Sequence, residues 1–411
     1  MSTQTLTNIK NNPLQYIIMF YAFIIPLSKA SVAIFAFVFF IIILATHKNN
    51  YKNTWLRVWN NTILKYFLIF IALHIFSLIF IESIDFNDAI LYIKRYIYLI
   101  IPAIAIYTIL KKEFISKVLS SFIVGMFISE LLSYGIFFEL ITLKHGTPSD
   151  PTPFMNHLDY SIFLVFTSLI LLNRVINVIT IKEKIIYFLF FCSTTANLFI
   201  TGGRIGQLAF FVSIFVIFFI NYEHKVKAFF TSLLLTISMF LVAYNFSSTF
   251  HNRLTQGINN LNNVIYQQNY CTSWGMRIGA WFIAKDIIVE NPIIGVGVQN
   301  HIVQLRYLID TKYPDMKCLR WFSTYHNQYL DTLTQFGILG FILFISIFIL
   351  ILKLRFTNKE YKNLSIIFVT IFAVGFTGDA FFYRYFIVGF FGIFLGLILK
   401  ASEVKDNKER I

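Results

Sequence analysis

The sequence predicts an all-α, polytopic integral membrane protein, and three observations support this fold class. The 411-residue chain is 57% hydrophobic and only 13% charged, whereas soluble domains carry about 25% charged residues. Its mean hydropathy is +0.70. Apolar runs of roughly twenty residues, long enough to cross a bilayer as helices, recur along the chain.

About twelve apolar segments are predicted to be transmembrane helices. The first lacks a clear small-residue cleavage site and a second apolar run follows it at once, so we interpret it as a retained helix and not a signal peptide. The segments are Leu14–Ser28, Ala30–Thr46, Ile63–Ile81, Ala89–Leu110, Val118–Leu143, Tyr160–Ile176, Ile185–Thr201, Arg204–Asn221, Ala228–Tyr244, Gln328–Leu354, Leu364–Asp379 and Phe381–Leu399.

Basic residues mark alternate connections, which the positive-inside rule places in the cytoplasm. The intervening connections contain few basic residues, and the one around Glu82, Asp85 and Asp88 is acidic. Both termini are therefore predicted to be cytoplasmic, and the net charge of +14 is a topology signal and not a nucleic-acid footprint. The basic connections are Lys48–Arg57, Lys111–Lys117, Arg174–Lys184, Lys225–Lys227, Lys353–Lys362 and Lys400–Arg410.

One long loop, residues 246–327, separates helices one to nine (1–245) from helices ten to twelve and the tail (328–411). It is predicted to lie on the outer face. Its stretch Met276–Glu290 has the pattern of a helix in the membrane interface, which Asn291-Pro292 ends. Cys271 and Cys318 either form a disulfide in this oxidising compartment or remain free thiols.

Two groups of cations do not fit the cytoplasmic pattern. Arg204 follows Thr201-Gly202-Gly203 at the start of a helix, where free N–H groups and the arginine fork favour a phosphate. Lys94 and Arg95 lie about two turns inside their segment, where charges usually face a cavity. Snorkelling to lipid headgroups is the alternative for both groups. Arg384 is predicted to pair with Asp379.

The long loop contributes two further candidates. Arg277 lies on the interfacial helix, and an exposed interfacial arginine is its alternative interpretation. His326 precedes the helix that starts at Gln328, where an imidazole can accept a proton near neutral pH or merely cap the helix. The sequence contains no HExxH, Walker or GxSxG motif, so we expect chemistry that needs no metal, cofactor or ATP.

The order of these residues resembles the bacterial O-antigen ligase and polymerase superfamily. The resemblance rests on Gly202-Gly203-Arg204, Arg277 with Trp281, Asn291-Pro292 with Gly295 and Gly297, and His326-Asn327 before Gly337-Ile338-Leu339-Gly340. It implies a GT-C-like fold with catalytic Arg204, Arg277 and His326, and substrate contacts from both arginines and Asn327, with Lys94 or Arg95 nearby. Gly203 is a departure, because many members have serine there.

The resemblance also implies a function. It indicates an inverting, metal-independent glycosyltransferase of the bacterial inner membrane, with its active site facing the periplasm. The donor would be O-antigen on undecaprenyl diphosphate and the acceptor lipid A-core, as in the O-antigen ligases. O-antigen polymerase and protein O-oligosaccharyltransferase are alternatives within the superfamily. A transporter or flippase of lipid-linked substrates is an alternative of another class.

Overall fold

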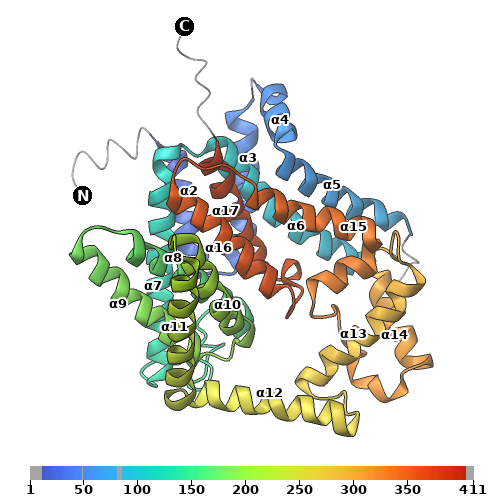
Figure 1. Cartoon of the computed structure of the whole chain (residues 1–411). Coiled ribbons are helices and arrows are strands. Elements are labelled where there is room, and N and C mark those ends of the chain that lie inside the picture. The colour runs from blue at the N-terminus through green and yellow to red at the C-terminus, as the bar shows by residue number, and fades with distance from the viewer. Residues whose placement is uncertain (1–11, 49, 81–85, 404–411) are drawn as a thin grey trace.

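The computed structural model describes residues 12–48, 50–80 and 86–403, and over these residues the chain is a bundle of helices (Figure 1). Each of the twelve predicted apolar segments forms a helix. These helices are α2 (Pro13–Ile24), α3 (Ala30–Thr46), α5 (Thr62–Ser77), α6 (Phe86–Ile109), α7 (Ile115–Phe137), α8 (His157–Asn177), α9 (Ile181–Ile200), α10 (Arg204–Asn221), α11 (Lys225–Phe246), α15 (Gln328–Leu352), α16 (Lys359–Gly375) and α17 (Tyr385–Ser402).

Fewer helices meet the length of a full membrane span. Among the described residues, eight are long and apolar enough to cross a membrane, or up to nine if α4 (Tyr51–Asn60) and α5 form one bent span. Helices α2 and α3 are apolar but shorter. Multiple apolar helices thus indicate a membrane protein, while twelve spans remain a prediction. The acidic residues Glu82 and Asp85 lie outside the described residues.

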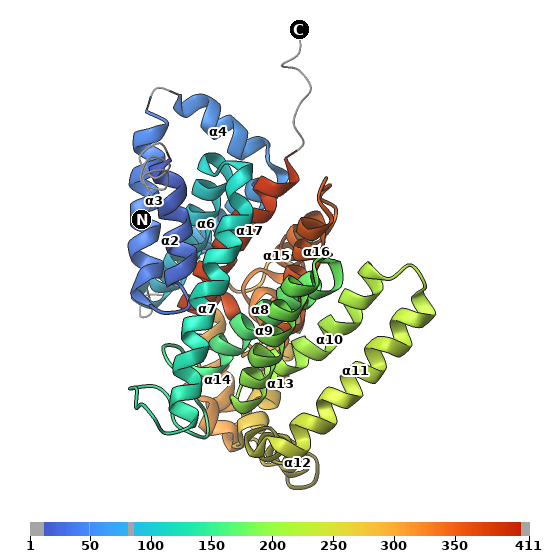
Figure 2. The ribbon, with the colours of Figure 1, turned by 90° about the vertical axis from the view of Figure 1, so that its left-hand side faces the viewer.

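The centre of the bundle is helix α17, which is buried along nearly its whole length from Phe386 to Ala401. A helix that is apolar all round requires neighbours on every side, and α6, α8 and α16 supply them. Phenylalanine rings interlock at these contacts; the rings of Phe166 and Phe394, for example, lie 4.4 Å apart. In contrast, α11 is mostly exposed and lies at the edge of the bundle (Figure 2).

Several basic connections meet on one side of the bundle. Arg57 of α4 pairs with Glu403 after α17 and donates to the carbonyl of Tyr107 near the end of α6. Arg174 at the end of α8 pairs with Glu360 at the start of α16, with 3.2 Å between Nε and Oε1. Each of these ion pairs brings two basic connections together, while the side of the membrane on which they lie remains a prediction. The opposite ends of the helices face the segment between α11 and α15 (Figure 1).

That long segment is helical and has a small core of its own. It contains α12 (Ser248–Gln267), α13 (Ser273–Glu290), α14 (Asn300–Thr311) and the 3₁₀ helix η3 (Pro314–Leu319). The predicted helix Met276–Glu290 is confirmed as most of α13. Its buried Ala280 and Ile283 pack with Leu305 and Leu319. Cys271 and Cys318 are joined by a disulfide, which settles the alternative that the sequence leaves open.

Helix α15 is interrupted at Gly337, where φ is 58° and ψ is −159°. The loop after α13 pairs with the break. Val296 and Gly297 donate N–H to the carbonyls of Thr334 and Gln335 at 2.9 and 2.8 Å, and Ile338 donates to Pro292 at 2.8 Å. Irregular backbone at membrane depth needs such partners. Gly337 therefore permits both the break in α15 and the close approach of the backbone at Ile293.

Gly337→Ala is expected to lower the thermal midpoint of the purified protein in detergent. A Cβ atom there would lie 2.3 Å from the carbonyl carbon of Ile293, and the positive φ adds about 1–3 kcal/mol of strain. Gly257→Ala in α12 is the matched control, since its Cβ would meet only Arg204 Nη1 at 3.5 Å. Equal midpoints for Gly337→Ala and wild type would show that the break needs no glycine.

Candidate active site

The first turn of α10 places Arg204 close to α8. A Cβ atom on Gly203 would lie 2.3 Å from Ser161 Cβ, so the glycine permits helix contact. The N–H of Gly202 donates to Asp150 Oδ1 at 2.8 Å. The glycine pair was predicted to allow an anion close to the backbone. The structure instead has a carboxylate of the chain at Gly202 and helix α8 against Gly203, so the side chain of Arg204 is the part available to a ligand.

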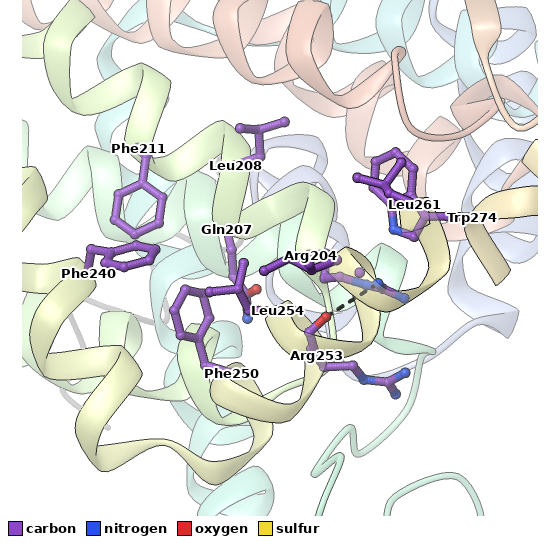
Figure 3. Close-up of a pocket in the computed structure, with 12 residues that line it drawn as sticks. Arg204, Gln207, Leu208, Phe211, Phe240, Phe250, Arg253, Leu254, Leu261 and Trp274 are labelled. Carbon is purple, nitrogen blue, oxygen red and sulfur yellow. Dashed lines mark hydrogen bonds between the residues drawn. The ribbon is translucent and has the colours of Figure 1, made fainter. Parts of the chain in front are cut away.

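An apolar cavity of about 310 Å³ adjoins Arg204 and is formed by α10, α11, α12 and the start of α13. Figure 3 shows Phe211, Phe240 and Leu208 on one side of Arg204, with Trp274 on the other. Arg204 Nη1 donates to the carbonyl of Arg253 at 3.5 Å. The cavity is thus lined mostly by apolar side chains and has a positive charge at one end, from Arg204.

Helix α13 holds Arg277 near this cation. Trp281, one turn later, donates its indole N–H to the carbonyl of Tyr325 at 3.1 Å and so ties α13 to the chain before His326. Arg277 is half-buried, and its charge interacts with those of Arg204 and Asp379. Among the described residues, neither Arg204 nor Arg277 forms an ion pair. Two cations without carboxylate partners favour an anionic ligand.

The pKa of Arg277 reflects this setting. Burial lowers the pKa of the guanidinium, the carboxylate of Asp379 raises it, and the charge of Arg384 lowers it, with a lowered pKa as the net result. Arginine nevertheless keeps its proton in proteins. Arg277 therefore offers a permanent, partly desolvated positive charge.

His326 lies in the turn before α15, in a left-handed backbone conformation with φ of 49°. Its Nδ1–H donates to Asp379 Oδ1 at 3.0 Å. Because a carboxylate can only accept, this bond fixes the tautomer and leaves Nε2 of the neutral ring free to take a proton. The side chain is 25% exposed, so a substrate can reach it. This geometry is that of a general base held by a carboxylate.

Asp379 is itself held by Arg384. Arg384 Nη1 lies 2.8 Å from Asp379 Oδ2, which confirms the predicted ion pair, and its Nε pairs with Asp159 of α8. Burial alone would raise the pKa of Asp379. The hydrogen bond from His326 and the charges of Arg384, His326 and Arg277 outweigh burial and lower the pKa to about 2. Asp379 therefore remains ionised and orients the histidine.

Asp379→Asn is expected to reduce the loss of stability in acid. The folded-state pKa lies below the ordinary value of 3.8, so the ionised carboxyl stabilises the fold above 3.8, and this contribution is lost as the pH falls through about 2. Thermal midpoints measured across this window should fall more for wild type than for Asp379→Asn. Asp310→Asn, which removes an exposed carboxylate paired with Arg320, should behave as wild type. An unchanged slope in Asp379→Asn would contradict this account.

A buried layer supports the turn that carries His326. Asp331 in the first turn of α15 accepts the N–H of Tyr325 at 3.1 Å, and the hydroxyl of Tyr325 donates to the carbonyl of His301 at 2.7 Å. His301 Nε2 lies 3.6 Å from Asp331 Oδ1, with both side chains fully buried. These buried contacts fix the backbone of the turn that carries His326.

The remaining predicted site residues, Lys94, Arg95 and Asn327, have contacts that stabilise the fold. Arg95 stacks on Tyr383, with Cζ 3.4 Å from the ring centroid, and Lys94 is exposed and lies over Tyr98. Neither of these aromatic contacts involves Arg204 or Arg277. Asn327 caps α15 by accepting from Tyr329 N and Leu330 N at 3.0 and 3.2 Å. Substrate contacts of these three residues remain predictions.

Sequence reasoning missed two residues of the site, Arg253 and Asp159, and also the role of Asp379 toward His326. Asp159 carries a local signal, because it follows Asn156, whose side chain caps α8. Arg253 lies on α12, an amphipathic helix within the stretch that the sequence predicts to be a loop. His326 and Asp379 are 53 residues apart, and only the fold brings them together.

Fold and site together define a membrane protein of many apolar helices, with unpaired arginines and a histidine–aspartate pair at one end of the bundle. Residues 188–345 match the model of a family described as O-Antigen ligase. The match supports membership of the O-antigen ligase/polymerase superfamily and includes Arg204, Arg277 and His326. It supports glycosyl transfer as the general activity. No curated protein matches the chain.

Proposed function

We propose that this protein is an O-antigen ligase that transfers polysaccharide from undecaprenyl diphosphate to lipid A-core on the periplasmic side of the bacterial inner membrane. The observation that carries the proposal is the convergence of Arg204, Arg277 and the His326–Asp379 pair beside an apolar cavity. A polyprenyl diphosphate combines a long apolar chain with a strongly anionic group, and both find complementary surfaces here.

The arginines have two tasks in this mechanism. They bind the diphosphate of the donor while its polyprenyl chain lies against the apolar side chains near Arg204 (Figure 3). They also stabilise the negative charge that grows on the leaving diphosphate in the transition state. The buried surroundings strengthen both interactions, because the effective dielectric is lower than in water.

His326 acts on the acceptor. Its Nε2 takes the proton from a sugar hydroxyl as the hydroxyl oxygen attacks the anomeric carbon of the donor. The bond between this carbon and the phosphate oxygen breaks, and undecaprenyl diphosphate leaves. One displacement without a covalent enzyme intermediate inverts the anomeric configuration. The donor's own phosphoester bond supplies the energy, so the step needs neither nucleotide nor metal.

The form of the outer surface supports a ligase over a polymerase. The segment between α11 and α15 carries three helices, whereas the connection from α7 to α8 is short. A single dominant outer segment is similar to the ligases, and polymerases commonly have two.

Product analysis tests the assignment. The purified chain in lipid receives undecaprenyl diphosphate-linked glycan and lipid A-core, and the products are separated by size and lipid. Lipid A-core capped with glycan supports the ligase. Lengthened glycan that remains on undecaprenyl diphosphate would instead identify a polymerase, and substrate movement without any covalent product would identify a transporter.

A further inference from the structure

A second cavity, of about 360 Å³, lies beside Arg384 and is called the polar cavity here. Three separate parts of the chain form it: the α2–α3 connection with Lys29, the α7–α8 connection with His145 and Asn156, and the chain around Tyr383 that leads into α17. Figure 2 shows α2 and α3 as a pair beside α7, which brings the first two parts together. None of its lining residues borders the apolar cavity near Arg204.

Positive charge exceeds negative charge at the polar cavity. Its wall contains Lys29 and Arg384 against one carboxylate, Asp159. Lys29 forms no ion pair among the described residues, and its Nζ lies 5.1 Å from the ring centroid of Tyr385. Its charge acts on Asp159 only at a range longer than an ion pair, so its ammonium group is available to an anionic ligand.

A buried arginine adds to this excess. Arg95 is only 9% exposed, and its Nε and Nη1 atoms have no hydrogen-bond partner. It stacks on Tyr383 and Tyr385, both of which line the cavity. Its charge is therefore held directly behind the aromatic wall, where the low dielectric keeps it effective.

The polar cavity is connected to the proposed general base through Arg384 and Asp379. Arg384 pairs with Asp159 on the cavity wall and with Asp379, which in turn holds His326. The apolar cavity adjoins Arg204, while the polar cavity adjoins Arg384. A transfer reaction has two substrates, and the two cavities offer a separate place for each.

The lining also indicates what kind of molecule fits. Tyr383, Tyr385 and Phe154 offer aromatic faces, and Asn156 and His145 offer hydrogen-bonding groups. Aromatic faces with amide and imidazole groups suit a sugar ring and its hydroxyls, and the cations suit a phosphate or carboxylate. We propose that the polar cavity binds the acceptor through an anionic saccharide portion, a reading that rests on the proposed function.

Binding measured without turnover tests this proposal. The full chain is placed in phosphatidylcholine nanodiscs, and the probes are a phosphorylated core oligosaccharide and its dephosphorylated counterpart. We expect Lys29→Glu to weaken binding of the phosphorylated probe about 10-fold or more, Lys29→Gln to weaken it less, and neither to affect the dephosphorylated probe. Lys144→Gln, an exposed lysine outside the cavity lining, is the matched control.

The outcomes separate this proposal from the proposed function. If the Lys29 dependence holds but no acceptor is ever glycosylated, the saccharide site stands and the ligase assignment fails. If glycan transfer proceeds but Lys29→Glu binds both probes like wild type, the saccharide site is overturned and the ligase stands. Loss of probe binding on addition of phosphatidylglycerol would assign the cavity to lipid headgroups and overturn the proposal.

Discussion

Replacing His326 with alanine is expected to lower the rate of glycan transfer by about 10²- to 10⁴-fold, the usual contribution of a positioned general base. The acceptor hydroxyl would then have to lose its proton to water. Donor affinity should remain, because the diphosphate meets Arg204 and Arg277 and not the imidazole. The measurement is transfer at saturating donor and acceptor, together with direct binding of the donor to the same preparation.

His224→Ala is the matched control for this variant. His224 precedes α11 at the connection that carries Lys225, and its side chain does not cap the helix. This control should transfer glycan at the wild-type rate. A His326→Ala protein with wild-type expression, wild-type thermal midpoint and undiminished turnover would remove His326 from the mechanism.

Arg277→Ala is expected to reduce kcat/KM by about 10²- to 10³-fold. This is the usual effect of removing one preorganised group that stabilises charge in the transition state. Arg277→Lys should recover only part of this loss, because an ammonium keeps the charge but lacks the planar fork that matches two phosphate oxygens. The loss should appear in kcat as well as in KM for the donor, since charge on the diphosphate grows during the reaction.

Arg320→Ala is the matched control for Arg277. Arg320 lies in the same segment between α11 and α15, but it is exposed and paired with Asp310. Its removal should leave kcat/KM unchanged, because exposed ion pairs contribute little. If Arg277→Ala and Arg320→Ala had the same small effect, the reduction would reflect general surface charge and not a site at Arg277.

Local patterns in the sequence predict much of the fold. Each apolar run forms a helix, and the predicted helix Met276–Glu290 forms most of α13, since hydrophobicity and periodicity act within a few residues of each other. The same holds for Arg204, which Gly202-Gly203 places at a helix start. Helix α12 is not predicted, because its polar sequence resembles a loop. In the structure the Ser247 side chain caps the helix by accepting the N–H of Phe250.

Contacts between distant residues account for what the sequence could not predict. Gly337 reads as a packing glycine within an apolar helix, and only the pairing with Pro292 and Gly297 explains the break. Likewise, no local pattern near His326 predicts its contact with Asp379. The two residues are separated in the sequence by α15 and α16, whose apolar residues do not indicate which ends meet. The left-handed turn at His326 depends on tertiary contacts such as Asp331 with Tyr325. Local propensity does not encode such contacts.

The central claim is that Arg204, Arg277 and His326 form one site for direct displacement on a polyprenyl diphosphate donor. The most direct test is transfer by the purified chain in detergent micelles, which enclose no compartment, with a chelator present and no nucleotide. The account predicts glycan joined covalently to lipid A-core with inverted anomeric configuration, and transfer by His326→Ala that is slower by about 10²- to 10⁴-fold. A donor-bound wild-type protein that makes no covalent product, or a product with retained configuration, would contradict it.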